Sequence, residues 1–155
     1  MFFDLKSIKY RVRNFIISIV AVYLTAALCE VKELIAEPLV VVAAKDSTLK
    51  ELSKSQIQKI YLGKVKTLPS GDAIVPLDQN NEKLKRKFYS KVIGKNGSAL
   101  KAYWARLIFT GRGQPPQQLI DDNDVINFVK EEKTSIGYIS LSSVDDSLII
   151  LYKVP

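Results

Sequence analysis

The sequence predicts an α/β fold in which a mostly parallel β-sheet is flanked by helices. Two observations support this prediction. Short apolar runs rich in β-branched residues alternate with helical patterns between residues 38 and 153, and the first run is apolar throughout, as in strands buried on both faces. The chain has 155 residues, of which 47% are hydrophobic and 25% charged, which is enough for one domain with an ordinary core.

The first elements have clear boundaries. A buried strand is expected at residues 38–44, "PLVVVAA". Ser53 and Gln56 have the spacing of a capping box, and Gly63 is expected to end the helix that they begin. After the turn residues "TLPSGD", a second strand is expected at residues 73–77, where Pro76 places the end of the strand at an edge or a terminus.

Three helical stretches follow. Gly94 is expected to end the first, Ser98 to cap the second, and the third runs from about Asp122 to Glu132. Each has apolar residues at helical spacing, which predicts one buried face. These residues are Leu84, Phe88 and Val92 with Tyr89 and Ile93 beside them; Leu100, Tyr103, Trp104, Leu107 and Ile108; and Val125, Phe128 and Val129.

Two further strands are expected near the end of the chain, at residues 135–140 and 147–153, joined by "LSSVDD". The predicted order is therefore β-α-β-α-α-α-β-β. Strands that alternate with helices favour a mostly parallel sheet with right-handed crossovers.

The N-terminus has the pattern of a secretory signal. Lys6, Lys9, Arg11 and Arg13 precede the uncharged apolar stretch 15–28. Small residues fit cleavage near residues 25–27 or at residue 36, and the alternative is an uncleaved N-terminal anchor. Cys29 is also a candidate for lipidation, although the large Leu28 precedes it.

The predicted organisation is therefore a signal peptide or anchor at residues 1–36 and a domain at residues 37–155. Such a chain is expected to be periplasmic or otherwise extracytoplasmic, and held at the inner membrane if the leader is retained. Contact with a membrane is expected only through the N-terminal segment.

Composition limits the function of the domain. The chain has no histidine and one cysteine, so a histidine triad, an internal disulfide and a cysteine metal cluster are excluded. Residues 37–155 hold 18 Lys and Arg and 13 Asp and Glu, a mildly basic balance with no aromatic-rich basic strand. We expect no nucleic acid partner and no cofactor, and no nucleophile motif of a hydrolase is present.

Three segments resemble a known family. "VVVAAKDSTLKELSKSQIQKIYLGKV", "AIVPLDQNNEKLKRKFYSKVIG" and "TSIGYISLSSVDDSLIILYKV" resemble the substrate-binding proteins of phosphate-type ABC transporters, which are two-lobed type II periplasmic binding proteins. The resemblance covers residues 38–153 and implies the second lobe with its flanking crossing strands. The first lobe has no counterpart, so a cleft ligand would need its opposite wall from a second copy or another protein.

The resemblance also implies that the phosphate contacts are largely replaced. Asp78 falls where the family has an Arg, and Glu82, Lys83 and Leu84 fall near its Ser-Gly-Thr turn, whereas Arg86 and Phe88 match the continuing helix. Glu82 in the first turn takes the place of an anion at the helix dipole, and a carboxylate at 4 Å repels a like charge by roughly 4 kcal/mol at an effective dielectric near 20.

Several polar residues remain candidates for ligand binding. Each has an alternative explanation in turn or cap chemistry: Asn80 or Asn81 as helix caps, Ser47 and Thr48 in a turn, and Arg112 between two glycines at a helix stop. Trp104 with Tyr103 is more typical of a hydrophobic core than of a ligand platform. Residues 144–147 are more typical of a solvated turn than of a cation site. The candidate residues are Ser47, Thr48, Asp78, Gln79, Asn80, Arg86 and Arg112.

The sequence therefore predicts an exported, non-catalytic domain of the solute-binding type. The alternative is a membrane-tethered protein-interaction or sensor domain. The expected partners are a small anion or other small solute, and a protein partner or second copy.

Overall fold

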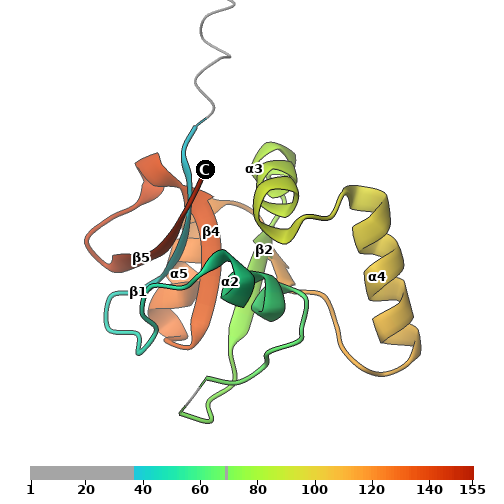
Figure 1. Cartoon of the computed structure of the whole chain (residues 1–155). Helices are drawn as coiled ribbons and strands as arrows, with labels where there is room; N and C mark the ends of the chain where they lie inside the picture. The colour runs from blue at the N-terminus through green and yellow to red at the C-terminus, as the bar shows by residue number, and fades with distance from the viewer. Residues whose placement is uncertain (1–36, 69) are drawn as a thin grey trace, which may run out of the picture. The chain divides into compact units, whose positions relative to one another are not determined.

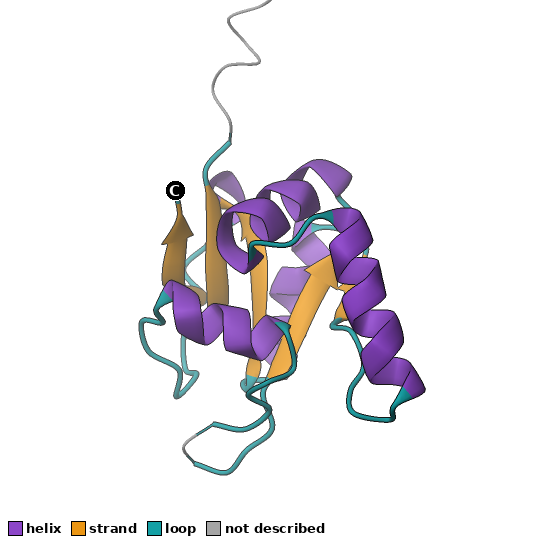
Figure 2. Ribbon diagram, turned by 45° about the vertical axis from the view of Figure 1, so that its right-hand side comes forward, coloured by secondary structure: helices purple, strands orange, loops and turns teal. Residues whose placement is uncertain are grey.

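The computed structural model describes residues 37–68 and 70–155, which form a five-stranded mixed sheet with helices on both faces (Figures 1 and 2). The strand order is β3-β2-β4-β1-β5. The predicted leader lies outside the described residues. The strands are β1 (Leu39–Ala44), β2 (Val75–Gln79), β3 (Gln117–Leu119), β4 (Ser135–Ser140) and β5 (Leu148–Val154).

The sheet is only partly parallel, which corrects the predicted mostly parallel arrangement. β2 runs parallel to both β3 and β4, but β1 is antiparallel to both of its neighbours, β4 and β5. A continuous apolar run shows that a strand is buried on both faces, and it does not show the direction of that strand. As a result, Glu37 and the end of β5 lie at the same end of the domain (Figure 1).

The helices cover the two faces unequally. The side chains of β1 alternate: Leu39, Val41 and Ala43 join the core under α2, α3 and η2, whereas Val40 and Val42 join a smaller core under α5. The helical elements are α2 (Lys54–Tyr61), α3 (Glu82–Phe88), the π-helical turn η2 (Tyr89–Ile93), α4 (Gly97–Phe109), α5 (Asp122–Glu131) and the 3₁₀ turn η3 (Leu141–Ser143).

Most helix boundaries agree with their sequence signals. The capping box of Ser53 and Gln56 begins α2, and Asn81 caps α3. Gly94 has a left-handed φ of 72° and ends the helical stretch, as predicted. The predicted cap of α4 was wrong, because Asn96 accepts the N–H of Ala99 at 3.0 Å, and Ser98 lies inside the first turn.

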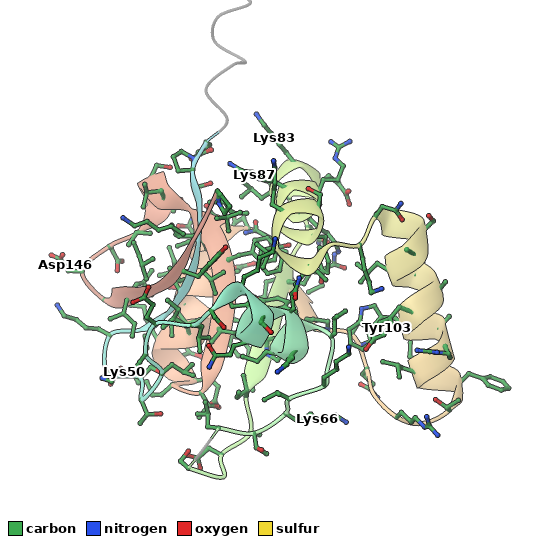
Figure 3. All side chains as sticks on the ribbon, viewed as in Figure 1. Lys50, Lys66, Lys83, Lys87, Tyr103 and Asp146 are labelled. Atoms are coloured by element: carbon green, nitrogen blue, oxygen red, sulfur yellow. The ribbon has the colours of Figure 1, made fainter. Side chains whose placement is uncertain are left out.

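Helix α4 packs on the domain through few side chains. Tyr103 faces the rest of the domain (Figure 3) and donates its hydroxyl to the Leu62 carbonyl at 2.7 Å, and Trp104 packs over Gly63. The predicted inward stripe is wrong at its end, because 55% of Ile108 is exposed. The predicted apolar face of α4 is wider than the surface on which the helix packs, so Ile108 remains outside the contact.

The last strand carries a bulge. Val41 lies opposite Tyr152 and Val42 opposite Ile150, so Leu151 has no partner on β1. The Leu151 carbonyl instead accepts the N–H of Leu52 at 3.0 Å. The segment before α2 is therefore fastened to the edge strand.

Gly137 lies in the middle of β4, where α5 packs closely on the sheet. A Cβ on Gly137 would lie 2.3 Å from Cγ1 of Val125, a fully buried side chain of α5. A side chain at this position therefore cannot be placed without moving the helix or the valine.

Gly137→Ala should lower the free energy of unfolding by about 1–3 kcal/mol, because an overpacked core has to shift. Urea denaturation of the full chain measures the change. Gly97→Ala is the matched control, since nothing lies within 4 Å of its Cβ and its φ is not left-handed, so it should not destabilise the chain. Equal losses in the two variants would contradict the close approach of α5 to β4.

Candidate functional site

The site lies at the carboxyl ends of the parallel strands. β2, β3 and β4 run in one direction, so their carboxyl ends meet at one edge of the sheet, where open α/β folds bind ligands. Asp78 and Gln79 end β2, and Ser140 ends β4. Three of the predicted candidates, Asp78, Gln79 and the following Asn80, therefore lie at the edge that the fold class favours.

Asp78 is buried and its carboxylate is fully engaged. Only 6% of the residue is exposed. One oxygen accepts the Tyr138 hydroxyl and the Gln79 N–H, the latter at 2.9 Å. The other oxygen accepts the Tyr89 hydroxyl at 3.2 Å and lies 2.9 Å from the Lys85 ammonium. Four donors from within the chain thus surround a single carboxylate, which satisfies both of its oxygens.

The two phenols stay protonated beside this carboxylate. Burial raises the pKa of Tyr138 and of Tyr89 far above the ordinary value, and the negative charge of Asp78 raises both further. Burial also raises the pKa of Tyr61, which donates to the Leu77 carbonyl at 3.0 Å. The tyrosines therefore act as hydrogen-bond donors and not as bases.

Gln79, which follows Asp78 in β2, connects this strand to α5. Its amide nitrogen donates to the Asp122 carboxylate at 2.9 Å and to the Tyr138 carbonyl at 2.7 Å. Asp122 also accepts the Ser140 N–H at 3.0 Å and the Ser143 hydroxyl at 2.8 Å. The side-chain oxygen of Gln79 is buried and has no hydrogen-bond partner among the described residues. This network fixes the starts of α5 and η3 to the ends of β2 and β4.

The first turns of α3 and α5 are occupied by the chain's own groups. Asn81 accepts the N–H groups of Lys83 and Leu84, and Asp121 accepts the N–H of Asp124. Acidic residues stand in the first turn of each helix, namely Glu82 in α3 and Asp122 and Asp124 in α5. These carboxylates complement the helix dipoles and place negative charge at the start of each helix.

The predicted candidates do not form one cluster. Asn80 follows β2 and Arg86 lies in α3, and both are exposed. Ser47 is buried and donates to the Lys133 carbonyl at 2.7 Å, just before β4 begins. It therefore lies at the opposite edge, one strand length or roughly 20 Å away. The exposed Thr48 follows it.

Arg112 also lies away from Asp78. Its carbonyl accepts the ammonium of Lys66 at 3.1 Å, and Lys66 pairs with Ile74 just before β2 begins. The arginine side chain itself is exposed. That any of the seven residues contacts a ligand stays a prediction.

The sequence reasoning missed the partners of Asp78. Tyr138 and Lys85 were not among the candidates, and Tyr89 was predicted only as a residue next to the buried face of a helix. Tyr138 is 60 positions from Asp78 and reaches it because β2 and β4 are neighbours. Local spacing carries no signal for such a contact. Among residues 37–68 and 70–155, no group of three or more acidic, histidine or cysteine side chains is placed to hold a metal ion.

Solved structures show what this fold is similar to. An ABC-type phosphate transport receptor from Vibrio cholerae matches with a TM-score of 0.60 at 16% identity. A putative phosphate ABC transporter substrate-binding protein from Clostridium perfringens, solved with bound phosphate, matches with a TM-score of 0.59 at 22% identity. The chain has the fold of these substrate-binding proteins. A third structure, PstS from Borrelia burgdorferi, has a TM-score of 0.56 at 15% identity.

The match to this substrate-binding fold is partial. In each of the three cases 74% of this chain is covered, but only 44–46% of the other chain. The chain thus spans less than half the length of these proteins, as a single-lobe fragment would. No family model matches the sequence. A search of curated proteins also finds no match.

Asp78→Ala should lower the free energy of unfolding by about 2–4 kcal/mol, because it leaves Lys85 and two buried phenols without their acceptor. We expect the lower part of this range, since Lys85 is 23% exposed and can reach water. Urea denaturation measures the loss. The matched control is Asp46→Ala, which removes an exposed aspartate paired with Lys133 at 2.8 Å and should change stability little. Equal losses would show that the Asp78 network is not a structural support.

Proposed function

We propose that the chain is an exported, non-catalytic domain of the solute-binding type, related to phosphate ABC transporter substrate-binding proteins, in which the phosphate-contacting groups are largely replaced. The observation that supports this best is the engaged carboxylate of Asp78 at the end of β2. A negative group of the chain itself already takes the donors that this edge offers.

An incoming phosphate would meet acids rather than free donors. Glu82, Asp122 and Asp124 stand in the first helical turns, and their nearby amides are capped by Asn81 and Asp121. Like charges at 4 Å repel by roughly 4 kcal/mol at an effective dielectric near 20. Arg86 and Lys83 are the exposed cations that remain beside this edge. Two flexible cations on a surface are a weak substitute for an enclosed oxyanion site.

The non-catalytic part of the proposal is supported by the chemistry of the same edge. The phenols of Tyr89 and Tyr138 are held neutral, and the adjacent carboxylate is paired. The chain has no histidine to act as a general base. The similar structures from Vibrio cholerae and Clostridium perfringens are a phosphate transport receptor and a putative substrate-binding protein.

Titration of the full chain with inorganic phosphate should give no saturable heat in the micromolar range, because the donors at the end of β2 are already engaged by the Asp78 carboxylate. Isothermal titration calorimetry measures this. Arg86→Ala and Arg112→Ala are matched exposed arginines, only the first of which follows β2. Micromolar phosphate binding that Arg86→Ala abolishes and Arg112→Ala preserves would overturn the proposal.

A second candidate function is a membrane-tethered protein-interaction or sensor domain, in which the leader is retained. The supporting observation is that α3 carries the exposed Lys83 and Arg86 together with Lys87, whose ammonium donates to the carbonyl of Glu37, where the described domain begins. No helix within residues 37–68 and 70–155 is long and apolar enough to cross a bilayer. In this candidate, residues 15–28 would be the anchor and a protein partner or second copy would supply the opposite wall.

N-terminal sequencing of the protein from cells should distinguish the two candidates. Under the first, the chain begins near residue 28 or 37, because signal peptidase removes the leader after small residues. Intact Met1 in the membrane fraction would instead support the tethered form. The released and retained fractions should be sequenced separately, so that unprocessed precursor is not mistaken for the mature protein.

A further inference from the structure

The net charge of the domain is concentrated in one segment. Residues 82–95 hold six Lys and Arg and one acid, whereas the rest of residues 37–155 holds twelve basic and twelve acidic residues. The segment comprises α3 and η2 with the two residues that follow. All of the net positive charge of residues 37–155 therefore comes from this segment, and the remainder is balanced.

The free cations of this element lie on its outer side. Leu84 and Phe88 are buried against the core, and Lys85 forms an ion pair with Asp78. Lys83, Arg86 and Lys91 are exposed and Lys87 is half-buried, and we call these four residues the cationic stripe. Figure 3 shows Lys83 and Lys87 projecting at the end of the domain where the chain enters.

Few acids oppose this stripe. Glu82 is exposed in the same first turn, Glu37 accepts the Ser142 hydroxyl, and Asp78 is buried beside Lys85. Within residues 37–68 and 70–155, the ion pairs are Lys85–Asp78, Lys130–Asp145 and Lys133–Asp46, so none involves the stripe. No ion pair among these residues therefore neutralises the stripe, whose positive charge can attract an external anionic surface.

The stripe lies next to the chain's entry from the predicted leader. The ammonium of Lys87 donates to the Glu37 carbonyl at 2.6 Å. Glu37 lies nine positions after Leu28, the last residue of the uncharged apolar stretch. Nine extended residues reach about 30 Å, so an apolar stretch held in a bilayer would keep this end of the domain near its surface.

We propose that the cationic stripe is a docking surface for an anionic lipid bilayer, a step that rests on the tethered form of the proposed function. Lys83 and Lys91 are separated by about 12 Å along the helix, which suits an array of headgroups rather than one phosphate ion. Each basic residue close to an anionic membrane strengthens binding about fivefold. The domain would then sit with α3 against the membrane.

Residue-resolved lysine labelling tests this docking. The full chain is reconstituted into vesicles of phosphatidylcholine alone or with phosphatidylglycerol, treated with an amine-reactive reagent and analysed by mass spectrometry. Lys83, Lys87 and Lys91 should react several-fold more slowly in the anionic vesicles, and high salt should remove this protection. Lys50, which projects elsewhere (Figure 3), and Lys101 of α4 are the internal controls.

Matched charge removals complete the test, with Lys91 as the reporter. In Lys83→Gln/Arg86→Gln/Lys87→Gln the protection of Lys91 should be lost, because about a hundredfold in surface binding is removed. Lys50→Gln/Lys64→Gln/Lys101→Gln removes the same charge elsewhere and should retain the protection. Circular dichroism shows whether both variants keep the fold.

The outcomes separate docking from tethering. Equal labelling of the stripe in neutral and anionic vesicles would overturn the docking surface even where Met1 is retained. Cleavage of the leader in cells would reject the tethered form, and the docking that rests on it, even where the lysines are protected in vesicles. Protection without vesicles, by inorganic phosphate or an oligonucleotide at matched ionic strength, would overturn the assignment to lipid.

Discussion

The carboxylate of Asp78, near the end of β2, joins this strand to β4 and to the helical stretch of α3 and η2. Tyr138 approaches it from β4, and Tyr89 and Lys85 approach it from the helical stretch that follows β2. A buried charge is costly unless it is paired and hydrogen-bonded, and this one has four donors. Its burial therefore constrains where β4 lies beside β2 and how α3 turns back onto the sheet.

The same constraint sets the character of the edge above it. Because the Asp78 carboxylate accepts from the donors around it, and helix amides donate to Asn81 and Asp121, the carboxyl edge has few free donors. Lys83 and Arg86, the cations of α3 nearest this edge, are exposed to solvent. One helix thus presents Leu84 and Phe88 to the core, Lys85 to the buried acid and the remaining basic residues to solvent.

The sequence predicted the parts of the fold that depend on local patterns. The strand at residues 135–140 and the capping box at Ser53 and Gln56 were correct because apolar runs and caps are local features. β3 was missed because its three residues, "QQL", are held by backbone pairing with β2 and not by buried side chains.

Nonlocal relations were beyond the sequence. The direction of β1 depends on which strands flank it, and the partner of Asp78 depends on β2 and β4 being neighbours. The choice between Asn96 and Ser98 as the cap was a near tie, since both residues are good caps and lie two positions apart. The candidates Ser47 and Asp78 were predicted together although antiparallel pairing of β1 separates them.

The bulge in β5 has a consequence for how copies of this domain meet. A regular outer strand offers an unbroken row of amides and carbonyls that a foreign strand can join. Here Leu151 is out of register and its carbonyl is held by Leu52, while the other outer strand, β3, is only three residues long. Both outer strands are thus poor templates for an added strand, which favours association of a neighbouring molecule through side chains.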